Sequence, residues 1–130
     1  DAKSSARILI DRQATLQILV NLIRNAIEAL VENDGPRRLE VKAHANGESV
    51  CFEVIDNGCG IPEENCVKIF HYGFTTKPRG HGFGLHTSAI SAQAMGGSLQ
   101  ATSDGPGRGA RFCLTLPKHT VPPGESPRLV

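Results

Sequence analysis

Three polar side chains recur at helical spacing in the segment Asp11–Val31, DRQATLQILVNLIRNAIEALV. Asn21, Asn25 and Glu28 lie at i, i+4 and i+7, so a helix stacks them in one row. Asparagine is a poor helix former, costing up to about 0.7 kcal/mol relative to alanine, and a solvated face more often carries Glu, Lys, Arg or Gln. From this row alone, a ligand-binding face and a solvated face are equally good interpretations.

A carboxylate follows the strand predicted over Val50–Ile55. Asp56 keeps the alternation of the apolar residues in that strand, so we expect it to point toward the core, where a carboxylate needs hydrogen-bond donors. The next residues, Asn57–Pro62, include Gly58 and Gly60, which permit a sharp turn and a close approach of the backbone to a ligand. A plain strand-to-helix turn that ends at Pro62 is the alternative interpretation.

The stretch Phe70–His86, FHYGFTTKPRGHGFGLH, has no clear period and several glycines. Long irregular segments inside compact domains are often functional lids. Its end leads into a predicted helix whose first amides could hold phosphate oxygens, with Lys77 and Arg79 adding charge. A flexible hinge is the alternative. The glycines do not match the GxGxxG fingerprint, and the chain contains no GxxxxGK[ST] loop, so both common nucleotide folds are disfavoured.

The remaining patterns predict the elements that position these residues. The long helix is expected to bury Leu16, Leu19, Ile23, Ala26, Ile27 and Leu30 on the side opposite the polar row. Alternation and turn residues predict strands at Arg7–Ile10, Leu39–Ala45, Val50–Ile55, Ser98–Thr102 and Ala110–Leu116, and helices at Glu63–Ile69 and Leu85–Met95. Asn46-Gly47 marks a hairpin. Antiparallel hairpins with segregated helices indicate an α+β two-layer sandwich.

Composition limits the possible functions. The chain has 130 residues, 39% of them hydrophobic, and a net charge of +1. We expect one domain over residues 1–117 and a flexible proline-rich tail over 118–130. There is no basic block for nucleic acid or an anionic membrane, and no apolar run that approaches the roughly 18 residues of a spanning helix. Four cysteines without a CxxC pair disfavour a structural zinc site and indicate a reduced, cytoplasmic protein.

Taken together, the motifs resemble the ATP-binding catalytic domain of bacterial two-component sensor histidine kinases, the GHKL or Bergerat fold shared with type II topoisomerases. Five segments carry the resemblance in the family's order: an N box at Asn21–Ala29, a first glycine box at Asp56–Pro62, an F box at Ile69–Lys77, a second glycine box at Gly80–Leu85 and a last one at Gly107–Phe112. They cover nearly all of Arg7–Pro117. The fold so implied has a mixed, mostly antiparallel sheet that helices cover on one face.

The resemblance implies ATP and Mg²⁺ as ligands. Asp56 would accept a hydrogen bond from the adenine amine, and Asn25 would hold Mg²⁺, with Glu28 supporting it or pairing with Arg24. The glycines at 58 and 60 would shape the pocket floor, and Lys77 would neutralise the γ-phosphate. The remaining implied nucleotide contacts are Ile61, Thr76, Gly80, His81, Gly82, Phe83, Gly84 and Leu85.

Asn21 stands where the topoisomerase branch carries a glutamate that activates water, which favours phosphoryl transfer over hydrolysis. Phe83 is larger than the usual residue at its place, so packing of the lid would differ. No histidine begins a His-Glu or His-Asp pair on an amphipathic helix. The resemblance therefore implies a catalytic fragment, monomeric alone, whose γ-phosphoryl acceptor is a histidine on a separate dimerisation domain and whose downstream partner is a response regulator. A nucleotide-dependent docking module and an anti-sigma-type serine kinase are the alternatives.

Overall fold

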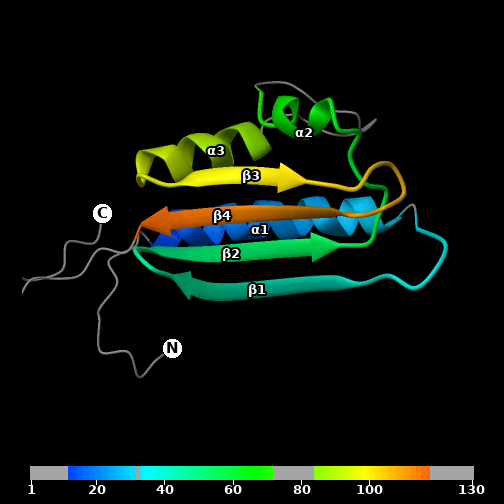
Figure 1. The fold of residues 1–130 in the computed structure, drawn as a ribbon, viewed down its shortest axis with the longest axis horizontal. Helices are drawn as coiled ribbons and strands as arrows, with labels where there is room; N and C mark the ends of the chain where they lie inside the picture. The colour runs from blue at the N-terminus through cyan, green and yellow to red at the C-terminus, as the bar shows by residue number, and fades with distance from the viewer. Residues whose placement is uncertain (1–11, 32, 72–83, 118–130) are drawn as a thin grey trace, which may run out of the picture.

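The computed structural model describes residues 12–31, 33–71 and 84–117 (Figure 1). Over these residues the chain forms three helices and four strands. In chain order they are α1 (Arg12–Val31), β1 (Leu39–Asn46), β2 (Ser49–Asp56), α2 (Asn65–Lys68), α3 (Gly84–Ala94), β3 (Ser98–Thr102) and β4 (Ala110–Pro117). The predicted strand at Arg7–Ile10 and the predicted tail at 118–130 lie outside the described residues.

The four strands form one sheet in the order β1-β2-β4-β3, and every neighbouring pair is antiparallel. The central pair, β2 and β4, aligns Val54 with Phe112 and Asp56 with Ala110. Residues directly opposite each other share a face. Asp56 therefore points to the same side of the sheet as the buried Val54 and Phe112, as its place in the alternation predicts.

The helices lie on one face of this sheet (Figure 1). Helix α1 packs against β2 and α3, while α3 also packs on β3 and β4. Side chains from both layers form the core: Ile18, Leu22, Ala26, Val54, Ala92, Leu99, Ala110, Phe112, Leu114 and Leu116. The predicted α+β two-layer architecture is confirmed.

The buried side of α1 differs from the predicted one. Its buried residues are Thr15, Ile18, Leu22, Ala26, Ala29 and Leu30. Leu16 and Ile27, predicted to be in the core, are 54% and 53% exposed. The helix is apolar around much of its circumference, so the sequence allows more than one buried stripe. Because α3 lies against one flank of α1, the polar row borders the buried stripe instead of opposing it.

Helix α1 is also long and apolar enough to cross a membrane by length and composition, which contradicts the expectation that no such segment exists. Its buried residues, however, pack against a sheet and a second helix. The central helix of a globular core passes the same test of length and composition. This placement explains the apolar run without a membrane.

The first hairpin forms where Asn46-Gly47 predicts it, with Gly47 and Glu48 as the two loop residues. Gly47 has φ +58° and Glu48 has a negative φ, the signs of a type II′ turn. Strand β1 is less buried than predicted, since Val41 is 52% exposed. Its apolar side faces the helical layer, but the helices pack mainly on the other three strands.

The other predicted elements are confirmed with small changes. Helix α2 spans only Asn65–Lys68 because the backbone before it makes tighter, three-residue hydrogen bonds: Asn65 N–H to Pro62 O, 2.8 Å, and Cys66 N–H to Glu63 O, 3.2 Å. Helix α3 ends at the predicted Gly96-Gly97 stop, where the Gly97 N–H donates to Ala92 O at 2.9 Å.

The second face of the sheet carries polar side chains and two cysteines. Cys51 on β2 is buried, while Cys113 on β4 is half-buried. Burial raises the pKa of the Cys51 thiol to about 11, and its hydrogen bond with Cys113 acts in the same direction. The Cys51 thiol is therefore neutral at pH 7.

Candidate functional site

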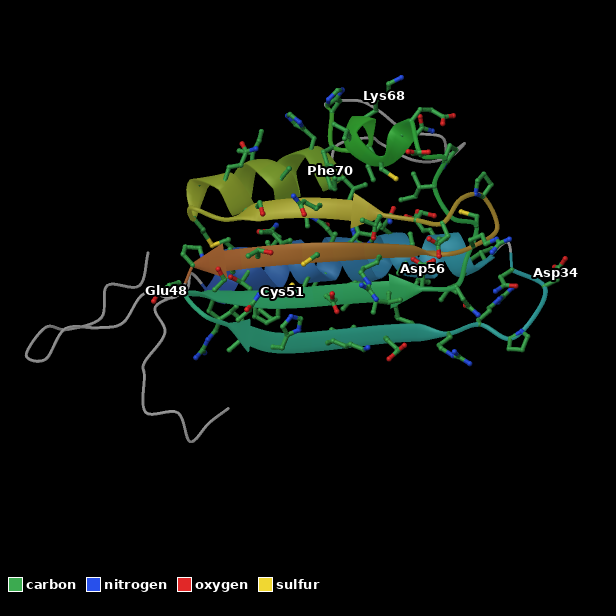
Figure 2. The ribbon with its side chains drawn as sticks, viewed as in Figure 1. Asp34, Glu48, Cys51, Asp56, Lys68 and Phe70 are labelled. Carbon is green, nitrogen blue, oxygen red and sulfur yellow. The ribbon has the colours of Figure 1, made fainter. Side chains whose placement is uncertain are left out.

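Asp56 is the last residue of β2, and only 5% of it is exposed. Its Oδ1 accepts a hydrogen bond from the Gly58 N–H at 2.8 Å, and its Oδ2 is buried as well. The bond from Gly58 folds the chain back at the end of the strand and fixes the carboxyl plane. Figure 2 shows Asp56 at the end of the sheet where α1 also ends.

The turn after Asp56 lies directly against the last turn of α1. The Cys59 N–H donates to Ala29 O at 3.1 Å, so one carbonyl near the end of α1 is satisfied by the turn. A Cβ on Gly58 would overlap that same carbonyl group. A residue with a side chain would clash at position 58, whereas Gly58 lets the backbone of the turn contact the backbone of α1.

On its other side the turn is closed by the connection between β3 and β4. The Gly107 N–H donates to Cys59 O at 2.6 Å, and the Gly109 N–H donates to Gly58 O at 3.1 Å. Gly60 has φ +74°, and a Cβ there would overlap Gly105 O. The first and the last of the predicted glycine boxes, which are far apart in sequence, are thus joined by backbone hydrogen bonds next to Asp56.

This backbone structure is held by the side chains of Ser103, Asn57 and Asn33, none of which the sequence marks as a site residue. Ser103 Oγ accepts from the Ile61 N–H at 3.1 Å and donates to Gly109 O. Asn57 Oδ1 accepts from the Arg38 N–H at 2.7 Å, and Asn33 Nδ2 donates to Asn57 O at 2.8 Å. Asn and Ser in turns often bond the backbone, but their long-range partners have no signal in the sequence.

The polar row of α1 leads from this turn toward α3. Asn21 Nδ2 donates to Ser88 Oγ at 3.0 Å, and Ser88 is fully buried between the helices. The start of α3 at Gly84 also lies beside the Asn21 side chain. Asn25 is half-buried one turn further along α1, whereas Glu28 is exposed. The row therefore lies between Asp56 at one end and the start of α3 at the other.

The segments on either side of residues 72–83 meet each other. His86 Nδ1 lies 3.1 Å from Phe70 O, and the Phe70 ring packs edge-on against Phe112 with 6.1 Å between the ring centres. The F box and the start of α3 are thus anchored together on β4. The start of α3 also lies beside Asn21, so this end of the predicted lid is next to the polar row of α1.

The predicted site residues divide into two groups. Gly84 lies beside Asn21, whereas Gly58 and Gly60 lie in the turn after Asp56, which contacts the end of α1. Asn25 is half-buried on α1 between these two places, and Ile61 and Leu85 are half-buried against the core. Glu28 follows in the same row of α1 but is exposed. The others, Thr76, Lys77, Gly80, His81, Gly82 and Phe83, lie outside the described residues.

This arrangement has the chemical features of a polar ligand site. A buried carboxylate can accept from an amine, and half-buried amide oxygens can ligate a hard cation. The glycine-lined backbone excludes side chains from the floor. A helix that begins at Gly84, beside the row, directs its first backbone amides and the positive end of its dipole toward that place, where an anion could bind.

Known proteins are similar to this chain in sequence. A sequence model of the family described as histidine kinase-, DNA gyrase B-, and HSP90-like ATPase matches residues 10–120. Sensor protein FixL of Bradyrhizobium diazoefficiens is 37% identical over 110 residues, which are 85% of this chain and 22% of that protein. Sensor histidine kinase DpiB of Escherichia coli is 36% identical over 113 residues, which are 84% of this chain and 20% of that protein.

Solved structures agree with these matches. The nucleotide-free catalytic domain of histidine kinase ThkA superimposes with a TM-score of 0.75 at 32% identity, covering 89% of this chain and 74% of that one. Full-length ShkA in complex with AMPPNP superimposes with a TM-score of 0.78 at 29% identity, covering 95% of this chain and 25% of that one. The chain spans about a fifth of the length of the two curated relatives.

The family model matches most of the chain, the fold matches that of a histidine kinase catalytic domain, and the five boxes occur in order. The chain therefore belongs to the histidine kinase-, DNA gyrase B- and HSP90-like ATPase family, and it is a sensor histidine kinase catalytic domain of that family.

Proposed function

We propose that this domain binds Mg²⁺-ATP and donates the γ-phosphoryl group to a histidine on a separate dimerisation domain. The observation that carries the proposal is Asp56, a buried carboxylate at the end of β2 above a floor built from two glycine-rich turns. A carboxylate in this position selects a ligand that donates a hydrogen bond, and the exocyclic amine of adenine is such a donor. Gly58, Gly60 and Ile61 form the floor beside it.

The Mg²⁺ site is assigned to Asn25. Its side chain is half-buried on the α1 row between Asp56 and the start of α3, and an amide oxygen is a ligand that Mg²⁺ accepts together with water and phosphate oxygens. Bound there, the ion would neutralise phosphate charge. Glu28, exposed one turn away, supports Asn25 from the outer side of the row.

The phosphate chain is assigned to the start of α3 and the segment before it. Gly84 and Leu85 open α3 beside Asn21, and Thr76, Lys77, Gly80, His81, Gly82 and Phe83 precede them in sequence. Lys77 would offset the charge of the γ-phosphate. Asn21 has an amide, which cannot act as the general base that a carboxylate would provide to activate water, so hydrolysis of ATP is disfavoured. The γ-phosphoryl group passes instead to an imidazole nitrogen, and ADP leaves.

The partners follow from this chemistry. The chain covers about a fifth of its curated relatives, so the histidine-bearing dimerisation domain belongs to the remainder of a longer sensor kinase, and a response regulator receives the phosphoryl group. We propose a cytoplasmic location and a monomeric state for the isolated domain of residues 1–117. Nucleic acid and membrane lipid are not ligands in this proposal.

The first test is calorimetric titration of a non-hydrolysable ATP analogue with Mg²⁺ into the native chain and into Asp56→Asn. The substitution keeps the shape of the side chain and removes the acceptor charge, so binding should weaken by at least about tenfold. Asp104→Asn is the matched control. It makes the same charge change at an exposed residue of the β3–β4 turn and should bind like the native chain.

The transfer step is tested separately, with Mg²⁺-ATP and a supplied histidine-bearing dimerisation domain from a related kinase. Transfer of labelled phosphate to the histidine, through a bond that acid and heat break, supports the proposal. Binding without transfer to any supplied histidine would favour a docking module, and transfer to a protein serine would favour a serine kinase. Equal binding by the native chain and Asp56→Asn would contradict the pocket itself.

A further inference from the structure

The face of the sheet opposite the helices brings Cys113 of β4 next to Cys51 and Glu53 of β2, which are distant from it in sequence. On the central strand pair, Cys51 lies opposite Thr115 and Glu53 lies opposite Cys113. These residues alternate with Val54 and Phe112, which point into the helical layer, so all of them point to the second face. This face is separate from the nucleotide site, since Asp56 points to the helical side.

The three ligand atoms are close to one another. Cys51 Sγ, Cys113 Sγ and a Glu53 carboxylate oxygen all lie within 4.8 Å of one another. Cys51 is buried, Cys113 is half-buried, and 16% of the Glu53 side chain is exposed. The group is therefore held in place by the sheet and is reachable from solvent on its Glu53 side.

The charges around the group can balance a thiolate-rich centre. Arg111 on β4 lies 3.8 Å from Glu53, and Lys42 on β1 lies opposite Glu53 in the register. His44 on β1 lies opposite Cys51 and is exposed. On binding, the cation displaces the thiol protons of Cys51 and Cys113 to solvent, and the resulting two thiolates and one carboxylate carry three negative charges. A divalent cation leaves one of these, which the neighbouring cations offset.

We propose that Cys51, Cys113 and Glu53 form a binding site for a thiophilic divalent cation, Zn²⁺, on the second face of the sheet. Two sulfur ligands and one carboxylate oxygen are donors that Zn²⁺ prefers, and solvent fills the fourth position. The ion would join β2 to β4, the two central strands. The absence of a CxxC pair does not exclude the site, because the strand register brings the ligands together.

The geometry requires little movement. With Zn–S distances of about 2.3 Å, a tetrahedral centre places its two sulfurs about 3.8 Å apart. The present group is within 4.8 Å, so rotations of side chains that move the sulfurs by about 1 Å complete the site. The backbone of two paired central strands stays in place.

The test is titration of the full chain with Co²⁺ under reducing conditions, followed by displacement with Zn²⁺. It uses the background Cys59→Ser/Cys66→Ser, in which Cys51 and Cys113 are the only remaining thiols. We expect one ion per chain, a sulfur-to-cobalt charge-transfer band and the visible bands of tetrahedral Co²⁺. Saturating Zn²⁺ should also raise the thermal unfolding midpoint, because an ion bound only to the folded state stabilises it.

Removing a ligand should abolish these signals. In the same background, Cys113→Ala should lose the charge-transfer band, and Glu53→Gln should weaken Zn²⁺ binding by about tenfold or more. Glu48→Gln, which makes the same charge change at an exposed residue of the β1–β2 turn, is the control that should keep the spectrum. Binding of the ATP analogue shows whether each variant is folded. If Cys113→Ala does not fold, Glu53→Gln decides the outcome. The site is refuted if the background chain shows no sulfur-to-cobalt band, or if Glu53→Gln binds Zn²⁺ as tightly as the background.

Discussion

The dipeptide Asn-Gly occurs twice, at Asn46-Gly47 and at Asn57-Gly58, and the two copies have different tasks. Gly47 has φ +58°, and a Cβ there would contact nothing within 4 Å. Gly58 is not among the glycines with positive φ, yet a Cβ there would overlap the carbonyl of Ala29. Gly47 is needed for the positive φ of its turn, whereas Gly58 is needed because the turn contacts a helix that is distant in sequence.

The two asparagines differ in the same way. Asn57 accepts a hydrogen bond from the Arg38 N–H at 2.7 Å and donates to Pro36 O at 2.8 Å, so it joins the turn to the segment after α1. Asn46 ends an edge strand and is exposed. A turn signal therefore predicts where the chain reverses, whereas the contacts of the turn decide whether it supports a site.

The largest effect is expected for Gly58→Ala. The new methyl group would push the turn away from the end of α1, and overpacking against backbone of this kind costs about 3 kcal/mol. Urea unfolding measures the change in stability, and titration with the ATP analogue should show weakened binding because Asp56 accepts from the Gly58 N–H. A Gly58→Ala chain with native stability and native affinity would show that the two Asn-Gly turns are equivalent.

A smaller effect is expected for Asn57→Ala. The variant loses the side-chain hydrogen bonds to Arg38 and Pro36, and two exposed neutral bonds contribute about 1.5 kcal/mol together. Asn46→Ala is the matched variant and should change the free energy of unfolding by less than about 0.5 kcal/mol. Equal losses for the two variants, measured by urea unfolding, would contradict the proposed difference.

The smallest effect of the three is expected for Gly47→Ala. Its Cβ meets open space, so the cost is the left-handed backbone alone, about 1 kcal/mol. Nucleotide binding should not change, because this turn lies at the other end of β2 from Asp56. Thermal and urea unfolding give the stability, and titration gives the affinity. A loss of affinity in Gly47→Ala would link the two ends of the strand and remove the contrast.

Much of the fold could be predicted because local patterns carry it. The strand Ser98–Thr102 was predicted with its observed bounds, and the Gly96-Gly97 stop and the Asn46-Gly47 hairpin depend on backbone angles that the residue type controls. The buried side of α1 was predicted wrongly at Leu16 and Ile27. An apolar helix offers several possible faces, and the packing of α3 and the sheet selects one of them.

At the candidate site, spacing predicted the row of Asn21 and Asn25 on α1, and alternation predicted the inward direction of Asp56, which is 5% exposed. The roles assigned to these residues stay predictions. The bond from Asn21 to Ser88, the support from Ser103 and the link between Phe70 and His86 could not be predicted, because each joins residues that are distant in the chain. No periodicity encodes which distant group a side chain meets.

By itself, the sequence determined the order of helices and strands, the inward direction of Asp56 and the family to which five ordered motifs point. These features depend on interactions among residues that are close in the chain. Only the tertiary structure decided which face of α1 is buried, why Gly58 must lack a side chain, and that Cys51, Glu53 and Cys113 meet on one face of the sheet. The physical reason is that strand register and helix packing bring distant backbone and side-chain atoms within contact distance, and these contacts are long-range.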